Sequence, residues 1–233
     1  MTAALWWVPV AVVVLGSPVL AAEGGDGWEP LFEEGGLTAW QKPIPGYDLP
    51  LYRASGVLDE DMYEILAVLN DFSRHREWMV FLTETRVVWR PDDFNLIAYV
   101  YFDAPWPVWD RDGVMRVTID LDREREEVTM RFTRIDLAQE PPREGVIRVP
   151  RGEMGARLRN LGGGRTEVEA QMSIDMGGDV PRWLVRWFSR RVPLKMVQRI
   201  RAQVKKTRGQ YADFIRKYDP RTGAGSGAAS APP

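Results

Sequence analysis

The side chains that most often carry out chemistry are scarce in this chain of 233 residues. It contains no cysteine, which removes disulfides, thiolate metal ligands and cysteine nucleophiles together. The single histidine, His75, stands in a charged stretch where we expect it to be exposed, and one histidine builds neither a histidine-rich metal site nor a catalytic triad. We find no spaced set of nucleophile and base. The sequence therefore predicts no catalytic residue, no metal and no cofactor.

Tryptophan is the abundant side chain, with ten copies, and 45% of the residues are hydrophobic. Aromatic side chains bury large areas and often line ligand cavities, but they fill ordinary cores equally well. The formal net charge is -2, so the chain lacks the basic excess that is typical of nucleic-acid-binding proteins. We expect no nucleic-acid partner, and the composition leaves an apolar ligand or a large core as alternatives.

A run of segments with period-2 alternation predicts an antiparallel sheet. In the clearest segment, 165–176, apolar side chains alternate with Glu167, Glu169 and Gln171, which is typical of a sheet with one covered face and one wet face. The expected strands are 37–42, 51–58, 82–90, 94–102, 114–121, 126–135, 145–159 and 165–176, the seventh interrupted near Pro150 and Gly152.

Segments with helical spacing lie between the second and third of these strands and after the last one. An aspartate pair precedes a helix over 62–69, and a short second helix is expected over 72–78. A long C-terminal helix is expected from Val180–Pro181, capped by Asp179 and kinked or restarted at Pro193. Its apolar stripe needs a covering surface, and the sheet offers one. The fold class is therefore α+β, a curved antiparallel sheet around a long C-terminal helix, with a tunnel between them if side chains leave it unfilled.

The amino terminus is typical of an export signal. An apolar run of about 16 residues, Leu5–Leu20, is shorter than a membrane span of about 20 and ends in small residues suited to cleavage after Ala21 or Ala22. We therefore interpret residues 1–22 as a signal peptide. No lysine or arginine precedes the run, so an uncleaved membrane anchor is the alternative. An exported chain without cysteine fits a bacterial periplasm.

Composition also separates two flanking segments from the globular part. Residues 23–36 are rich in glycine and acidic side chains and predict a flexible leader with a short helical turn near Trp28–Phe32. Residues 219–233 are rich in glycine, alanine, serine and proline and predict a disordered tail. The single domain is expected over 37–218.

A corner rich in proline and tryptophan, Asp103–Arg116, joins two of the expected strands. Prolines cannot donate to a sheet ladder, so Pro105 and Pro107 mark a turn between strands. The corner resembles a motif of the START family of lipid-transfer domains, which have the helix-grip fold. Three other segments resemble that family in the same order: Asp71–Trp78, Gly145–Arg148 and Ser173–Leu184. The resemblance covers about Trp40–Tyr218 and, taken together with the export signal, suggests a bacterial exported member.

That resemblance implies one lipid, a sterol, phospholipid or ceramide, inside the tunnel. In sterol-binding members a buried arginine follows the corner, and the matching residue here is Arg116. The position matching its acidic partner is Ala98, so the charged pair is incomplete, and Tyr99 or Tyr101 is expected to supply a polar contact instead. An exposed Arg116 is the alternative, because arginine is rarely buried without a partner.

The other expected ligand-binding residues are apolar side chains of two strands and the C-terminal helix. They are Val128, Met130, Phe132, Met172, Ile174, Leu184, Trp187 and Phe188. Ordinary core packing explains each of them equally well. The implied function is extraction of a lipid from one membrane and its release at another, driven by apolar burial at about 25 cal/mol per Å².

The C-terminal helix is strongly basic, with ten lysines and arginines and no acidic residue over 180–212. Such a face attracts anionic lipid headgroups, so transient membrane contact through this helix is one interpretation. A solvated helix face balanced by the acidic body is the other. If the helix docks, it also gates the tunnel, with a hinge at Gly177–Gly178. We expect a monomer.

Two other functions fit the same fold. Related helix-grip domains include cyclases and aromatases, in which arginine, tyrosine and aspartate side chains of the cavity would do acid–base work. A lipid sensor that does not transport its ligand is the second alternative.

Overall fold

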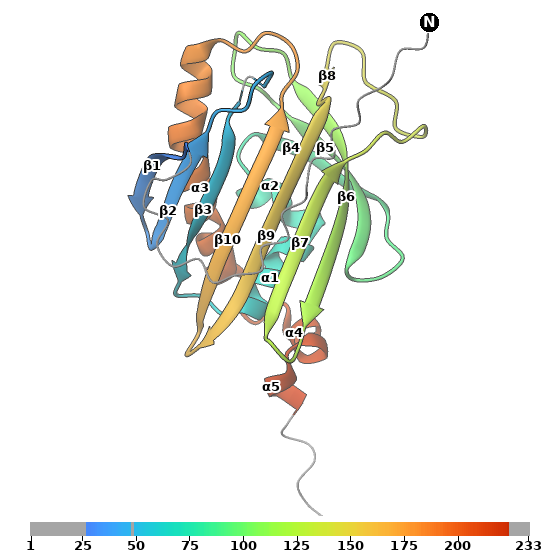
Figure 1. The fold of residues 1–233 in the computed structure, drawn as a ribbon. Helices are drawn as coiled ribbons and strands as arrows, with labels where there is room; N and C mark the ends of the chain where they lie inside the picture. Colours follow the sequence, from blue (N-terminus) through green and yellow to red (C-terminus); the bar gives the residue numbers. More distant parts are fainter. Residues whose placement is uncertain (1–26, 48, 224–233) are drawn as a thin grey trace, which may run out of the picture.

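The structure, a computed structural model, describes residues 27–47 and 49–223. One large antiparallel sheet carries the helices on a single face, which we call the inner face, and leaves an outer face (Figure 1). This is the predicted α+β helix-grip arrangement. The predicted signal peptide and cleavage site, the start of the leader and the last ten residues lie outside the described residues.

The sheet contains ten strands. They are β1 (Glu29–Glu34), β2 (Leu37–Lys42), β3 (Leu51–Leu58), β4 (Leu82–Trp89), β5 (Asn95–Phe102), β6 (Arg111–Asp122), β7 (Glu127–Arg134), β8 (Ile147–Arg148), β9 (Arg151–Gly162) and β10 (Arg165–Asp175). Nine follow the antiparallel order β1-β2-β3-β10-β9-β7-β6-β5-β4, and β8 pairs in parallel with the start of β6. The last strand therefore lies in the middle of the sheet, beside β3, so the chain leaves the sheet centre to enter its long helix.

The helices are α1 (Met62–Asn70), the 3-10 helix η1 (Phe72–Arg74), α2 (His75–Trp78), α3 (Arg182–Thr207), α4 (Ala212–Tyr218) and α5 (Pro220–Gly223). Asp61 caps α1 as predicted, because its carboxylate accepts a hydrogen bond from the Tyr63 amide at 2.9 Å. Asp179 does not cap α3, whose first turn follows Pro181 without a side-chain bond, and α3 continues through Pro193. Among the described residues, no helix has the length and apolarity to cross a membrane.

The core lies between the inner face and the helices. Leu66 of α1, Val117 of β6, Met130 of β7 and Val204 of α3 are all fully buried in one cluster. The predicted alternation is confirmed in β10, where Val168 packs against this cluster. The second half of α3 therefore packs on the sheet through the same core as α1.

Besides the Asp179 cap, two predictions about local structure are wrong, and the predicted long C-terminal helix has a different end. The expected helical turn near Trp28–Phe32 is the strand β1, because its backbone pairs with β2 at the sheet edge. The expected tail begins with ordered chain: Asp219 is buried and accepts hydrogen bonds from the guanidinium of Arg221, at the start of α5. The long C-terminal helix ends at Thr207 and restarts as α4, and Gly209 lies between them with φ of 80°.

His75 is buried, with 2% of its surface exposed, and the prediction of exposure is therefore also wrong. Its ring lies 4.2 Å from that of Phe72 and 4.8 Å from that of Trp78, measured between centroids. Its Nε2 lies 3.0 Å from the carbonyl oxygen of Leu69. Burial lowers the pKa of His75 to about 4, so the ring is neutral at pH 7. The charged neighbours in sequence concealed this, because η1 and α2 turn them to the other side.

Candidate functional site

A row of small side chains crosses the inner face of the sheet. Ala54, Ala170 and Ala156 lie directly opposite one another on β3, β10 and β9. The next inner-face row, closer to the end where β10 leads to α3, consists of Tyr52, Met172, Met154 and Phe132. Phe132, Met172 and Ile174 are only half-buried although they face the helices. Accessible apolar surface therefore remains on the inner face.

The predicted ligand-binding side chains of the strands divide into two groups. Val128 and Met130 are fully buried within the core cluster, so they fill the core and line no accessible surface. Phe132, Met172 and Ile174 lie together on the accessible part of the inner face. The alternation in the sequence identifies the face of each residue but not how far the helices cover it.

The predicted helix residues also differ from one another. Leu184 is buried with 6% of its surface exposed, and Phe188 is half-buried. Trp187 is 42% exposed, and its ring centroid lies 6.0 Å from that of Phe81, just before β4. Phe81 has a φ of 65°, which is strained for a bulky residue. Phe81 and Trp187 thus form a contact between the sheet and the first half of α3.

Arg116, Tyr99 and Tyr101 do not reach the inner face, and the prediction that they contact a ligand there is wrong. The residues between them on β5 and β6, Ala98 and Val117, belong to the inner-face core, so the three predicted residues point outward. Arg116 is exposed on this outer face, which confirms the alternative that the sequence left open. The family match placed Arg116 on the wrong face of β6. Adjacent residues of a strand point to opposite faces, so an error of one position reverses the predicted side.

The two tyrosines belong to a polar cluster that fastens the long connection between β7 and β9 onto the outer face. Tyr99 donates to Asp112 at 3.0 Å, and burial together with this bond raises the pKa of Tyr99 above its usual range. The Tyr101 hydroxyl donates to Asp110 at 2.5 Å, which raises the pKa of Tyr101 to about 12. Arg148 completes the cluster with a buried ion pair to Asp112 at 2.6 Å. These contacts are structural.

An arginine that the sequence did not single out, Arg111, is buried with only 2% of its surface exposed. It shares the inner face with Val117, six residues along β6. Its Nη2 donates to the Gly177 carbonyl at 3.2 Å and its Nη1 donates to the Trp109 carbonyl. Burial lowers the pKa of Arg111. This side chain therefore ties the β5–β6 corner to the segment that leads into α3.

Two glycines shape that segment. Gly177 and Gly178 have φ of 64° and 67°, a region that other residues rarely adopt. A methyl group on Gly178 would also lie 2.7 Å from Cδ1 of Ile147. The segment therefore has no room for a larger residue at this position.

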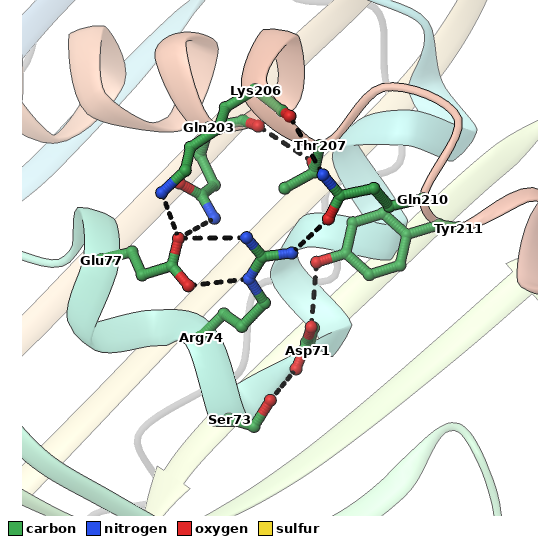
Figure 2. A network of polar contacts seen from close by, with 9 residues as sticks. All are labelled: Asp71, Ser73, Arg74, Glu77, Gln203, Lys206, Thr207, Gln210 and Tyr211. Atoms are coloured by element: carbon green, nitrogen blue, oxygen red, sulfur yellow. Dashed lines mark hydrogen bonds and ion pairs between the residues drawn. The ribbon is translucent and has the colours of Figure 1, made fainter.

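The second half of α3 is fixed by a network of polar side chains (Figure 2). The Glu77 carboxylate of α2 accepts hydrogen bonds from Arg74 at 2.7 Å, Gln203 at 2.9 Å and Lys206 at 2.7 Å. These donors hold the pKa of Glu77 well below its usual range. A second link joins Tyr211 to Asp71 at 2.9 Å. In the first half, one side-chain hydrogen bond joins α3 to the sheet among the described contacts, between Tyr52 and Ser189.

Three exposed tryptophans lie on the two chain segments that meet before the start of α3. Trp106 is 89% exposed and Trp109 63% exposed on the β5–β6 corner, and Trp183 is 57% exposed on α3. The hydrogen bond between Arg111 and Gly177 brings these two segments together. Exposed tryptophans at one end of a molecule are typical of an interaction surface.

The outer face also has an open groove of about 800 Å³ between the β4–β6 strands and the connection after β7. Trp89, Ile97, Arg116 and Leu137 are among its lining residues. Arg116 therefore belongs to this groove and lies apart from the accessible inner face.

Comparison with known families matches residues 19–209 to the START domain. The chain belongs to the START domain family. Among curated proteins, this START domain is 27% identical to the phosphatidylcholine transfer protein of Rattus norvegicus over 174 residues, which cover 73% of this chain and 79% of the relative. It is 26% identical to an uncharacterised protein of Pseudomonas aeruginosa over 198 residues, covering 84% of this chain and 96% of the relative.

Solved structures show the same fold. A STAR-related lipid transfer protein from Xanthomonas axonopodis has 25% identity and a TM-score of 0.68, covering 77% of this chain and 99% of that chain. Human STARD10 has a TM-score of 0.70 at 16% identity, covering 88% of this chain and 84% of that chain. The predicted family and the helix-grip fold are therefore confirmed.

Proposed function

We propose that this START domain binds one lipid on the inner face, beneath the first half of α3, and transfers it between membranes. The observation that carries the proposal is the half-buried apolar surface of Phe132, Met172 and Ile174, which faces the helices and remains accessible. Covering such surface with a lipid chain gains about 25 cal/mol per Å² of apolar area. Each chain of a lipid would therefore contribute several kcal/mol without covalent chemistry.

The relatives support a phospholipid as the ligand. Curated relatives are named phosphatidylcholine transfer proteins, and a similar solved structure is named a lipid transfer protein. A sterol held by a charged pair is less well supported, because Arg116 lies on the outer face and Ala98 stands where the acidic partner was expected. Phosphatidylcholine is therefore the first lipid to test.

We propose that the protein contacts membranes through the first half of α3 and through the end of the molecule that carries the exposed tryptophans, which we call the tryptophan end. Tryptophan prefers the membrane–water interface, and Trp106, Trp109 and Trp183 are exposed at that end. Arg186 and Arg191 are exposed on the same half of α3 and would favour anionic headgroups. The charges in the second half are partly balanced by acidic partners, as between Lys206 and Glu77. The proposed membrane contact therefore involves only the first half of the basic helix and not its whole length.

The same half of α3 would act as the gate. Among the described contacts, its polar links to the rest are the Tyr52–Ser189 bond and, through Gly177, Arg111, beside the apolar contact of Trp187 with Phe81. Glu77 anchors the second half independently. Movement of the first half about the Gly177–Gly178 segment would then open the inner face while the core stays packed.

We further propose binding rather than catalysis, a monomeric state, and export to a bacterial periplasm with cleavage after Ala21 or Ala22. The cyclase-like enzyme and the non-transporting sensor remain the alternatives. Support for binding comes from the lipid-transfer names of the relatives. Support for export comes from the apolar run and small residues of the sequence alone.

The test is transfer of fluorescent phosphatidylcholine from donor to acceptor vesicles, measured as loss of donor quenching. We expect transfer to rise in proportion to protein concentration. Binding of the lipid without transfer would identify a sensor, and conversion of the lipid or of an aromatic polyketide would identify an enzyme. If the protein neither binds nor transfers any lipid, the proposal is overturned.

A further inference from the structure

Arg134, the last residue of β7, is a mostly buried cation on the inner face. It lies directly opposite Met115 and follows Phe132 on the same side of the strand. A methyl group on Gly152 would lie 3.8 Å from Cβ of Arg134 and 3.5 Å from Cγ1 of Ile174. Arg134 is therefore adjacent to Ile174 on the accessible part of the inner face.

The guanidinium of Arg134 is incompletely paired. Its side chain is only 11% exposed, and its Nε is buried with no hydrogen-bond partner among the described residues. Its Nη1 lies 2.7 Å from Asp136, a bond that lowers the pKa of that carboxyl. The Asp136 side chain is 85% exposed, so water competes for it and the pair compensates the buried cation weakly.

A buried donor without a partner is costly and calls for an explanation. The surrounding inner-face residues, Met115, Phe132 and Ile174, are apolar and offer no acceptor. Asp136 engages Nη1, so the other edge of the guanidinium, formed by Nε and Nη2, is not the one that pairs with this carboxylate, and Nε has no partner among the described residues. That edge presents two parallel N–H donors, the arrangement that pairs with two oxygens of a phosphate.

We propose that Arg134 binds the phosphate of a phospholipid headgroup through its Nε and Nη2 edge while the acyl chains cover the apolar inner face. The inference rests on the proposed lipid binding and adds the group that selects the lipid class. Asp136 remains on the other edge and keeps the guanidinium in place. A lipid with the same chains but no phosphate would leave Nε unpaired and bind more weakly.

The test compares phosphatidylcholine with diacylglycerol of identical chains, so that the phosphocholine group is the difference between the ligands. Binding is measured by displacement of a fluorescent lipid from the full-length protein. We expect the wild type to prefer phosphatidylcholine, and Arg134→Leu to weaken phosphatidylcholine binding by about tenfold or more while diacylglycerol binding is unchanged. Arg134→Lys should retain part of the preference, because it keeps the charge and loses the fork.

Arg116→Leu is the matched control, because Arg116 lies on neighbouring β6 opposite Thr133 but points outward. It should leave both affinities unchanged. A wild type that binds neither lipid would overturn the proposed function itself. A wild type that binds both equally, or an Arg134→Leu variant that loses both equally, would overturn the role of Arg134 while lipid binding stands.

Two further measurements separate a binding role from a structural one. In the lipid-free protein, Arg134→Leu removes a poorly paired buried charge, so we expect an unchanged or higher melting temperature. A marked loss of stability would overturn the proposal by making Arg134 structural. Titration with inorganic phosphate tests whether the site binds a lipid headgroup or free phosphate. If millimolar phosphate displaces phosphatidylcholine and the protein does not prefer phosphatidylcholine over diacylglycerol, the headgroup assignment is overturned.

Discussion

The hydroxyl of Tyr52 on β3 lies 2.5 Å from the hydroxyl of Ser189 on α3, and both residues are buried. Ser189 donates its own proton to the Val185 carbonyl at 2.9 Å, so Tyr52 is the donor in the pair. The bond links the accessible inner face to the half of α3 that the Glu77 network does not reach. Its position makes it a sensitive probe of whether that half of the helix moves.

Tyr52→Phe removes this link and keeps the ring. We expect the free energy of unfolding to fall by about 1 kcal/mol, because Ser189 retains its bond to Val185. Amide exchange should accelerate in the first half of α3, and lipid transfer should become faster. Tyr211→Phe is the control, since it removes one hydroxyl bond beyond the other end of α3, in the turn before α4. Equal exchange in both halves for both variants would contradict a movable first half.

Glu77→Gln tests the anchor of the second half. An unperturbed glutamate has a pKa of about 4.3, and three donors hold that of Glu77 well below it. A lowered carboxyl pKa stabilises the fold above pH about 4.3 and loses that contribution as the pH falls towards the folded value. The variant should be less stable at pH 7 and lose less stability between about pH 5 and 3. The measurement is the denaturant midpoint of each protein across this pH range. If the midpoints of the wild type and the variant change with pH in parallel, the proposed network is contradicted.

His75 gives a separate pH signature. Its folded pKa is about 4, below the unfolded value of about 6.5. Its neutral form therefore stabilises the fold above pH about 6.5, and this contribution is lost as the pH falls from about 6.5 to 4. As the chain has one histidine, an NMR titration of the imidazole reports this group alone. An apparent pKa near 6.5 would contradict the burial between Phe72 and Trp78.

Trp106→Ser and Trp109→Ser test the membrane-contacting end. Both side chains are exposed, so we expect weaker binding to vesicles with little change in stability. Sedimentation with anionic vesicles measures the binding. Trp89→Ser is the control, since Trp89 is 55% exposed on the edge strand β4. If Trp89→Ser weakens vesicle binding as much as the other two, the contact is not confined to the tryptophan end.

The order of strands and helices was predictable because side-chain periodicity and capping are local. Leu51–Leu58 alternates and is β3, and the aspartate before Met62 begins α1. Predictions failed where pairing decided the outcome. Glu29–Glu34 has a weak local preference for any secondary structure and becomes a strand through its pairing with β2. His75 is buried by packing against Phe72 and Trp78.

The site was predictable in kind and only partly in its residues. The apolar side chains Phe132, Met172 and Ile174 follow from alternation, and the structure brings them together. Arg116 failed because one residue of register exchanges the two faces of a strand. Arg134 continues the alternation of Phe132 but was missed, because a charged residue at the end of a strand is typical of an exposed position. Its neighbours include Gly152 of β9, 18 positions away in the sequence, which only the pairing of the strands brings beside it.

The most direct test of lipid binding on the inner face is photo-crosslinking with phosphatidylcholine that carries a diazirine in its acyl chain, followed by mapping of the labelled peptides. We predict labels on the strands and helix that carry Phe132, Met172 and Phe188. Labels confined to the outer groove beside Trp89 and Arg116, or no specific label, would contradict the account.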